Sequence, residues 1–325
     1  RAPNVTLFAR DWRAARSVRG NLGWDGAVLG NRFRAFVDAT LALNLHQPGA
    51  FDRNFAGAQQ FALAGEGARP VYVRPQEIVP ATGAIAVGAG RVTDRFQRVA
   101  EQRSDLRSTS QQLQLSLTPL SFSSRLGWSL AYTWQRARER TYGFLSTAGD
   151  PRATEWARGA FDGRHQVVYS LSYNLFDAVR LRWNGFVRSG LPFTPQVAGD
   201  VNGDGWASND RAFVFDPADP ALRASDPALA EAMRGLLATG SPEARACLAR
   251  QLGALAGRNS CQGPWTHTAN LQISLNPMKV RMPQRATLSL AVSNPLGAVD
   301  RLPHGDRKLR GWGQTPFADP SLFYV

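Results

Sequence analysis

The amino-acid sequence predicts an all-β protein, an antiparallel transmembrane β-barrel of which this chain supplies only a part. Three observations predict this fold class. Apolar and polar side chains alternate with a period of two. The connections between these segments alternate between short and long, and several segments are long and rich in tyrosine and tryptophan. These patterns predict about nine or ten strands.

The period of two is clearest in the segment "RLGWSLAYTWQ", residues 125–135. Its apolar side carries Leu126, Trp128, Leu130, Tyr132 and Trp134. Successive residues of a strand point to opposite faces of a sheet, so the segment has one apolar face and one polar face. The same alternation recurs in residues 18–28, 33–45, 113–117, 167–175, 179–188, 269–275 and 288–292.

Short and long connections alternate strictly along the sequence. Short turns are predicted near residues 30, 121–124, 177–178 and 277–284, and long insertions at 48–103, 142–163, 195–264 and 296–320. Transmembrane barrels have short periplasmic turns and long external loops. A large soluble β-sandwich is the alternative; it accounts for the alternation but not for this order of connections.

The chain is expected to be a fragment, with residues 1–325 forming one partial barrel domain. Bacterial barrels close with an even number of strands. Ten strands close only a small barrel, for which a loop such as 195–264 is very long. The sequence also begins within the pattern and ends where "SLFYV" reads as the start of another strand.

The basic composition does not indicate nucleic-acid binding. The net charge is +13, and Lys279 and Lys308 are the only lysines. The arginines are scattered, without the basic run of a nucleic-acid patch. A surface that faces anionic outer-membrane lipid or lipopolysaccharide accounts for the same charge. The first residues have no signal-peptide pattern, so the sequence is expected to start after processing or within a longer protein.

The longest insertion, residues 195–264, is predicted to contain two short helices. Asp226 with Pro227, and Ser241 with Pro242, have the N-cap and first-position residues that begin helices. Cys247 and Cys261 bracket the second predicted helix. In an oxidising compartment the two cysteines are expected to form a disulfide, and two free thiols are the alternative.

The run "DVNGDGWASND" resembles a calcium loop. Asp200, Asn202 and Asp204 occupy its first, third and fifth positions, where alternate oxygens can turn toward one Ca²⁺ ion. The match then fails, because Arg211 stands where a bidentate glutamate belongs and Asp210 falls one place early. The four residues Asp200, Asn202, Asp204 and Asp210 are candidate ligands, and a turn that needs no metal is the alternative.

No catalytic constellation stands out, and the chain is not expected to be an enzyme. No GxSxG, HExxH or P-loop motif occurs. His165 and His267 lie at predicted strand starts, where lining an interface is a simpler role than acting as a base.

Several segments resemble the C-terminal barrel of TonB-dependent outer-membrane receptors, in particular the Oar-like branch that carries a carboxypeptidase-regulatory-like domain. The resemblance is densest from Arg164 to Tyr324, and it rests on combining "SGLPFTP" with the Asp/Asn/Gly loop that follows. It is carried by "NGFVRSGLPFTPQVAGDVNGDGWASNDRAFVFDP", "CLARQLGALAGRNSCQGPWTHTANLQISLNP", "RATLSLAVSNPLGAVDRLPHG" and "RGWGQ".

The resemblance implies a barrel of about 22 strands with an N-terminal plug in its lumen. It also implies energy coupling through TonB, ExbB and ExbD, and uptake of a scarce or large ligand such as a siderophore, glycan or peptide. The chain departs from this plan because no plug domain and no TonB box are recognisable in it.

The expected function is therefore that of the C-terminal barrel portion of an energy-coupled receptor in the bacterial outer membrane. Arg180, Arg182 and Arg188 are expected to face the lumen, where they guide an anionic ligand or pair with acidic residues of the plug. One alternative is a surface-binding or secretion-linked barrel without active uptake. Another is an outer-membrane barrel hydrolase.

Overall fold

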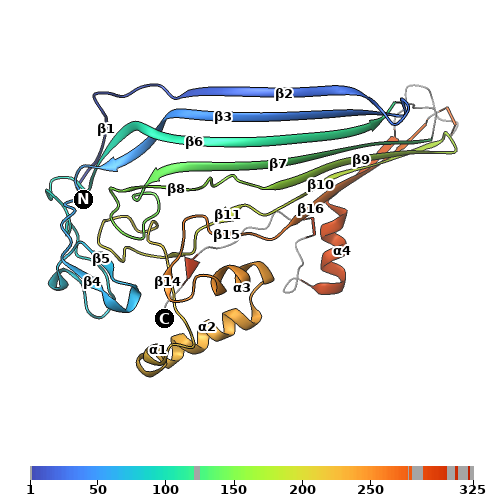
Figure 1. Cartoon of the computed structure of the whole chain (residues 1–325). Helices are drawn as coiled ribbons and strands as arrows, with labels where there is room; N and C mark the ends of the chain where they lie inside the picture. The colour runs from blue at the N-terminus through green and yellow to red at the C-terminus, as the bar shows by residue number, and fades with distance from the viewer. Residues whose placement is uncertain are drawn as a thin grey trace.

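The computed structural model describes residues 2–120, 125–276, 278–279, 288–305, 312–313 and 321–322. Within them, the dominant feature is a large curved sheet whose long strands run side by side (Figure 1). Its strands are, in sheet order, β17 (Leu288–Ser293), β16 (Thr266–Leu275), β10 (Val179–Arg188), β9 (His165–Leu175), β7 (Leu126–Tyr142), β6 (Arg98–Pro119), β3 (Phe33–Asp52) and β2 (Arg16–Val28). Each is antiparallel to its neighbours, which confirms the predicted antiparallel order.

Two further strands join the sheet beside this path. β1 (Asn4–Phe8) runs parallel to the first residues of β6, and β8 (Thr154–Arg158) pairs with the last residues of β7. Both are five residues long and pair only near the ends of the long strands where the loops begin. They extend the loop end of the sheet.

The short and long connections alternate as predicted. The turn between β2 and β3 passes through Leu29, Gly30 and Asn31, all with positive φ, and Phe176 and Asp177 have positive φ between β9 and β10. The predicted turn at 121–124 and most of that at 277–284 lie outside the described residues. All the turns that are described lie at one end of the sheet, and the first three long loops lie toward the other (Figure 1).

The first long loop is shorter than predicted, because β3 continues to Asp52 and β6 already begins at Arg98. The pairing of β3 with β6 shifts register between Asn44 and Gln47 and again between Gln47 and Gly49. His46 has a positive φ of 55° there. Such bulges interrupt the period of two, so the alternation ends well before the strand does.

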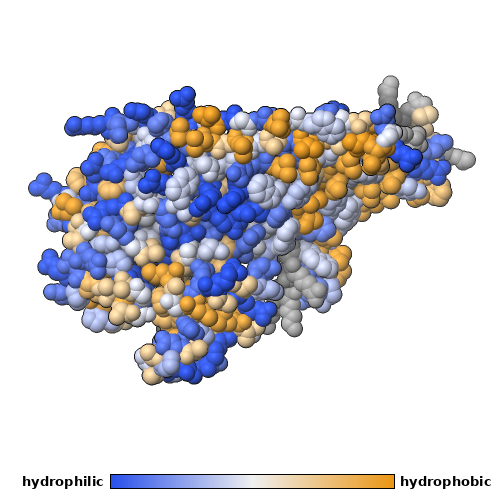
Figure 2. Space-filling view, in the orientation of Figure 1, coloured by the Kyte–Doolittle hydropathy of each residue, from blue (hydrophilic) through white to orange (hydrophobic). Residues whose placement is uncertain are grey.

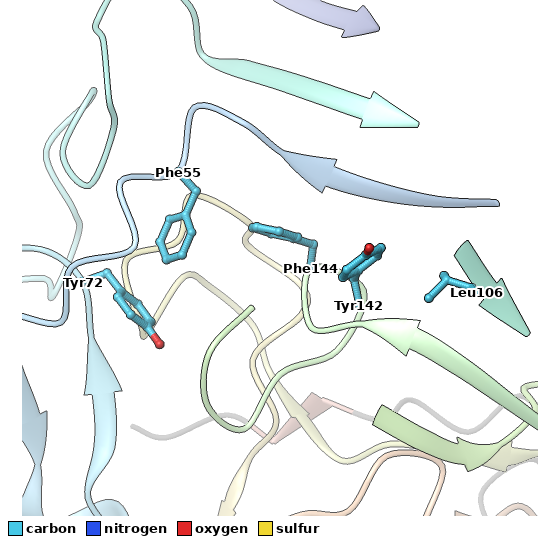
Figure 3. Packing of buried hydrophobic residues seen from close by; sticks show 5 residues of the cluster. All are labelled: Phe55, Tyr72, Leu106, Tyr142 and Phe144. Carbon is cyan, nitrogen blue, oxygen red and sulfur yellow. The ribbon is translucent and has the colours of Figure 1, made fainter. Parts of the chain in front are cut away.

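The buried core lies among the loops. Five aromatic or aliphatic side chains pack together near the loop ends of β6 and β7 (Figure 3). Their members are Phe55, Tyr72, Leu106, Tyr142 and Phe144. Edge-on ring contacts join Phe55 to Tyr72 and to Phe144. The cluster therefore binds the first two long loops to the sheet.

A second core lies in the longest loop, which contains α1 (Pro220–Ser225), α2 (Pro227–Thr239) and α3 (Pro242–Ala249). The two predicted helices are confirmed with their caps, since Asp226 accepts from the N–H of Leu229 and Ser241 from that of Ala244. Four buried side chains form this core: Val214, Met233, Leu248 and Ala256.

The disulfide Cys247–Cys261 is present, and its cysteines are 14 positions apart in the sequence. The cysteines do not bracket the second helix as predicted. Cys247 lies inside α3, which ends at Ala249, and Cys261 lies in the short strand β15 (Cys261–Gln262). The helix is short because the chain turns at Gly253, whose φ is 73°, into β14 (Ala254–Leu255).

The remaining elements are short. They are β4 (Phe61–Leu63), β5 (Arg69–Val71), β11 (Pro192–Phe193), β12 (Gln196–Val197), β13 (Phe213–Val214), β18 (Ser321–Leu322), the single-turn helices η1 (Ala64–Glu66) and η2 (Pro75–Glu77), and α4 (Pro295–His304). The prediction that "SLFYV" begins another barrel strand is wrong for Ser321–Leu322, because that backbone pairs in parallel with β12 in the longest loop. No helix in the described part of the chain is both long and apolar enough to cross a membrane.

Candidate functional site

One face of the large sheet is apolar across all eight strands of its main path. The register brings the predicted apolar positions into rows that cross the sheet. One row contains Leu117, Leu130, Tyr169, Gly185 and Ala269. Another contains Trp128, Leu171, Trp183, Leu271 and Val292.

Many large apolar side chains of this face are exposed. Leu22 is 78% exposed, Leu41 61%, Leu130 44% and Leu290 59%. Figure 2 shows apolar side chains gathered over the strands toward the turn end of the sheet, and mostly hydrophilic side chains over the loops at the other end. Monomeric soluble proteins rarely expose an apolar surface of this extent. The sandwich alternative requires a second sheet that covers this face. Within the described residues no second sheet does so.

Aromatic side chains border the apolar face at both ends. Near the turns, Phe33 packs against Trp128 with ring centroids 5.7 Å apart. Near the loops, His165 stacks between Tyr132 and Trp265, with centroids 6.2 and 6.0 Å away. On β9 the face extends from His165 to Tyr173, the nine residues 165–173, and a membrane-spanning strand needs about 9–11.

Two tyrosine–histidine pairs lie at the loop border of the apolar face. The hydroxyl of Tyr132 is 2.8 Å from Nδ1 of His165, and that of Tyr169 is 2.7 Å from Nε2 of His267. Tyr169 reaches its partner across Gly185, where a Cβ atom would lie 2.8 Å from its hydroxyl. The role predicted for the two histidines, lining an interface, stays a prediction.

The opposite face of the sheet is polar and carries the three predicted lumenal arginines. Arg180 lies between Asn174 and Ser274 of the neighbouring strands, and Nε of Arg180 donates to Oδ1 of Asn174. Arg182 lies between Ser172 and Gln272, and Arg188 between Gln166 and Thr266. A cavity of about 510 Å³ near the turn end is lined by Arg180 and Arg182 but not by Arg188.

The acidic turn at residues 200–210 buries the side chains of Asn202, Asp204, Asn209 and Asp210, and backbone N–H groups of the turn hold its carboxylates. The carboxylate of Asp200 accepts from the N–H groups of Gly203, Asp204 and Gly205, at 2.7, 3.1 and 2.6 Å. That of Asp210 accepts from the N–H groups of Val201 and Asn202.

Burial disfavours the charge on these carboxylates. It raises the pKa of Asp204 to about 7, with repulsion from Asp210 adding to the effect. Burial likewise raises the pKa of Asp210 to about 6, although backbone hydrogen bonds and Arg69 oppose it. The pKa of Asp200 is also raised by burial, against three backbone hydrogen bonds.

The four candidate metal ligands lie in one turn, but their oxygens already have hydrogen-bond donors. Oδ1 of Asn202 accepts from the N–H of Asp204, and Oδ2 of Asp204 accepts from the side-chain amides of Asn202 and Asn209. In the described part of the chain, no three His, Cys, Asp or Glu residues are grouped to hold a metal ion. Calcium binding at Asp200, Asn202, Asp204 and Asp210 stays a prediction.

Sequence reasoning missed the ion pairs that hold this turn against the rest of the loops. Arg69 of β5 is 1% exposed and contacts Asp210 and Glu66, and Arg91 pairs with the buried Asp52 at 2.6 Å. Arg211 pairs with Glu155 of β8. Each arginine is isolated in a loop sequence, so no local pattern distinguished it from an exposed one.

No family model and no curated protein matches the chain. Among solved structures, the chain is similar to the outer membrane transporter YddB from Escherichia coli, at 9% identity and a TM-score of 0.50. That match covers 91% of this chain and 31% of YddB. The FrpB iron transporter from Neisseria meningitidis matches at 9% identity and a TM-score of 0.43, over 90% of this chain and 29% of FrpB.

The chain thus spans less than a third of the length of these transporters. At 9% identity, the likeness to YddB shows the fold alone. With the antiparallel strand order and the exposed apolar face, it shows that the predicted fold class is correct. The chain is a partial all-β barrel of the kind found in an outer-membrane transporter.

Proposed function

We propose that the chain is part of the wall of a transporter barrel in the bacterial outer membrane. The observation that carries this proposal is the exposed apolar face with an aromatic border at each end. In that location the face contacts lipid, the turns lie in the periplasm and the long loops lie outside the cell. The sheet edges at β2 and β17 have no outer neighbour among the described residues. They pair with further strands of the complete barrel, because lipid does not tolerate open edges.

The proposed transport is energy-coupled, through a plug domain and the TonB, ExbB and ExbD proteins. Its support is the resemblance of the segments around "SGLPFTP" to the Oar-like branch of TonB-dependent receptors, together with the barrel fold. The proposed ligand is a scarce or large molecule, such as a siderophore, a glycan or a peptide. The long loops are proposed to capture it.

Arg180, Arg182 and Arg188 are proposed to face the lumen and to pair with acidic residues of the plug. The strand register supports this proposal, because it places all three arginines on the polar face of the sheet. Asn174 is the only neighbour to which one of them donates a side-chain hydrogen bond within the described residues. Their charges are therefore available to a partner inside the barrel.

Two measurements on the full-length protein test the proposal separately. Fractionation of cells, followed by a gel-mobility comparison of heated and unheated protein, tests the barrel, which we expect in the outer membrane as a heat-modifiable species. Recovery in the soluble fraction would contradict it. Binding of the purified periplasmic domain of TonB tests the energy coupling. If the protein folds as a barrel but does not bind this domain in the presence of its ligand, the proposed barrel location stands and the proposed energy coupling is wrong.

A further inference from the structure

A cavity of about 770 Å³ lies between the first long loop and the acidic turn of the third. Its volume is in the range of ligand-binding pockets. Two segments that are far apart in the sequence supply most of its lining, residues 82–89 and residues 198–201. The rest of the lining is Ala2, Ile78, Arg91, Asp94, Phe96, Gln97, Gly205 and Ala207.

The wall that the first loop supplies is apolar and uncharged. Residues 78–89 contain no acidic, basic or histidine side chain. Val87 lines the cavity and is fully exposed, and Val79 is 46% exposed. The facing wall has the small or apolar residues Ala198, Val201 and Ala207. Because exposed apolar surface of this kind marks interaction sites, the two walls fit an apolar ligand.

The apolar wall also has a free backbone edge, at Ile85. The neighbouring residues pair with an antiparallel segment. The N–H of Ala86 donates to the carbonyl oxygen of Glu77, and the N–H of Val79 donates to that of Ala84, both at 2.8 Å. Successive residues of such a pair direct their backbone groups to alternate sides, so those of Ile85 point away from the partner. Both groups lack a hydrogen bond within the described residues, and a free edge of this kind can pair with an extended peptide.

The lining of the cavity has an excess of negative charge. Among the described residues that line it, Arg91 is the only cation, and its guanidinium already pairs with the buried Asp52 at 2.6 Å. Asp94 is exposed and has no ion pair in the described part of the chain. Asp200 is the second carboxylate of the lining, whereas Arg95 does not line the cavity. The lining therefore complements a ligand with one positive group.

Both walls are held in place by the protein itself. A Cβ atom on Gly205 would lie 1.4 Å from Nη2 of Arg91, so the guanidinium lies directly against this glycine. Nη2 of Arg98 donates to the carbonyl oxygen of Gly205 at 2.7 Å. Beyond the apolar wall, the N–H of Val92 donates to the carbonyl oxygen of Asn54 at 2.8 Å. Because the walls are ordered in advance, binding loses little conformational entropy in the protein.

We propose that this cavity captures a short apolar peptide with a free amino terminus. The peptide lies extended along Ile85 and exchanges two backbone hydrogen bonds with it. Its apolar side chains lie between the two walls, and its ammonium group pairs with Asp94. The inference rests on the proposed function, which places the cavity at the cell surface, and it selects the peptide from the three proposed ligand classes.

The charge contact is tested by calorimetric titration of the full-length protein in mild detergent. The probe is a synthetic pentapeptide of alanine and valine, with a free or an acetylated amino terminus. The parent is expected to bind the acetylated form on the order of fivefold more weakly. Asp94→Asn should weaken binding of the free form by a similar factor and leave the acetylated form unchanged. Asp11→Asn, at an exposed position outside this cavity, is the matched control and should bind both forms as the parent does.

The backbone contact is tested at Ile85. Ile85→Pro removes an N–H group that has no partner within the described residues, so the loop is expected to fold and peptide binding to weaken on the order of fivefold. Ile85→Val keeps the N–H group and should bind nearly as the parent does. Pentylamine, an apolar amine without peptide groups, should bind more weakly than the pentapeptide.

Three results would each overturn the inference. They are equal affinity of the parent for the free and the acetylated peptide, equal affinity of Ile85→Pro and Ile85→Val, and binding of pentylamine as tight as that of the peptide. Failure of the proposed function is seen separately. A protein that binds the periplasmic domain of TonB but not the peptide overturns this inference alone, whereas recovery in the soluble fraction overturns the proposed location before any titration.

Discussion

The guanidinium of Arg69 lies 3.3 Å from Oδ1 of Asp210, although the two residues are 141 positions apart, and both side chains are buried. Nη2 of Arg69 also donates to the carbonyl oxygen of Arg211, at 2.6 Å. The pair joins the first long loop to the acidic turn of the third. The first and third long loops are thereby held together at the loop end of the sheet.

Replacement of Arg69 with glutamine should open the acidic turn. The carboxylate of Asp210 then stays buried without its ion-pair partner, and removing one member of such a pair typically costs about 3–5 kcal/mol. Limited proteolysis of the folded barrel should show faster cleavage within residues 195–215. The matched control is Arg234→Gln, whose pair with Glu231 is exposed and should contribute about 1 kcal/mol or less. Equal cleavage rates of the two variants would contradict the predicted contribution of the Arg69–Asp210 ion pair to the stability of the turn.

The acidic turn should become less stable as the pH rises. The pKa values of Asp204 and Asp210 are raised in the folded state, to about 7 and about 6, from 3.8. The folded turn therefore binds their protons more tightly than the unfolded chain does. This contribution is complete below about pH 4 and is lost as the pH rises through 6 and 7. Protease resistance of the turn, measured in chelator, should be higher at pH 5 than at pH 8.

Two changes sharpen that measurement. Asp204→Asn removes one titrating carboxyl and its repulsion of Asp210, so the difference between pH 5 and pH 8 should shrink. Addition of calcium to the parent protein at pH 8 tests the metal prediction. Restored protease resistance would support a cation at Asp200, Asn202, Asp204 and Asp210. Unchanged resistance would show that hydrogen bonds stabilise the turn without a metal ion.

Loss of the disulfide should loosen α3 without unfolding the barrel. Cys247→Ala combined with Cys261→Ala frees a segment of 14 positions, worth roughly 3 kcal/mol in the loop-entropy model. Hydrogen exchange of the amides in α3 should accelerate, while that in β7 and β9 stays slow. If exchange in α3 matches that of the parent, the packing of Met233 and Leu248 is sufficient to hold the helix.

A charge on the apolar face should impair barrel assembly. Leu130→Arg places a guanidinium in the middle of the face, at a cost of about 2–4 kcal/mol near the bilayer midplane. Its neighbour Ser129 lies on the polar face opposite Ser170, so Ser129→Arg should assemble normally. The folded fraction in outer membranes, measured by heat-modifiable gel mobility, compares the two. Normal assembly of Leu130→Arg would show that lipid does not contact this face.

The long strands were predictable because their two faces meet different surroundings. On β7, the alternation of Leu126 to Trp134 with small or polar residues predicted the strand and its two faces. Two of the three helices of the longest loop, α2 and α3, were predictable for a local reason. Asp226 and Ser241 each accept a hydrogen bond from the N–H group three residues further along the chain. The short helix α1 was not predicted. β1 and β8 were missed because five residues at the edge of a loop hold too little periodicity.

The loop contacts could not be predicted, since they join residues far apart in sequence. Nothing near Arg69 marks it as buried, and its partner Asp210 appeared in the sequence only as a displaced calcium ligand. Similarly, nothing in the sequence around Ile85 or Asp94 indicates a shared site. Only the folded chain brings both residues to one cavity with Asp200.

The measurement that most directly tests the membrane account is single-cysteine labelling along β7 of the full-length protein in native outer membranes. Positions 126–134 would be replaced one at a time and exposed to a lipid-soluble and to a water-soluble thiol reagent. If the apolar face contacts lipid, cysteines at Leu126, Trp128, Leu130, Tyr132 and Trp134 react with the lipid-soluble reagent, and cysteines at the positions between them react with the water-soluble one. Labelling of both sets by the water-soluble reagent would contradict it.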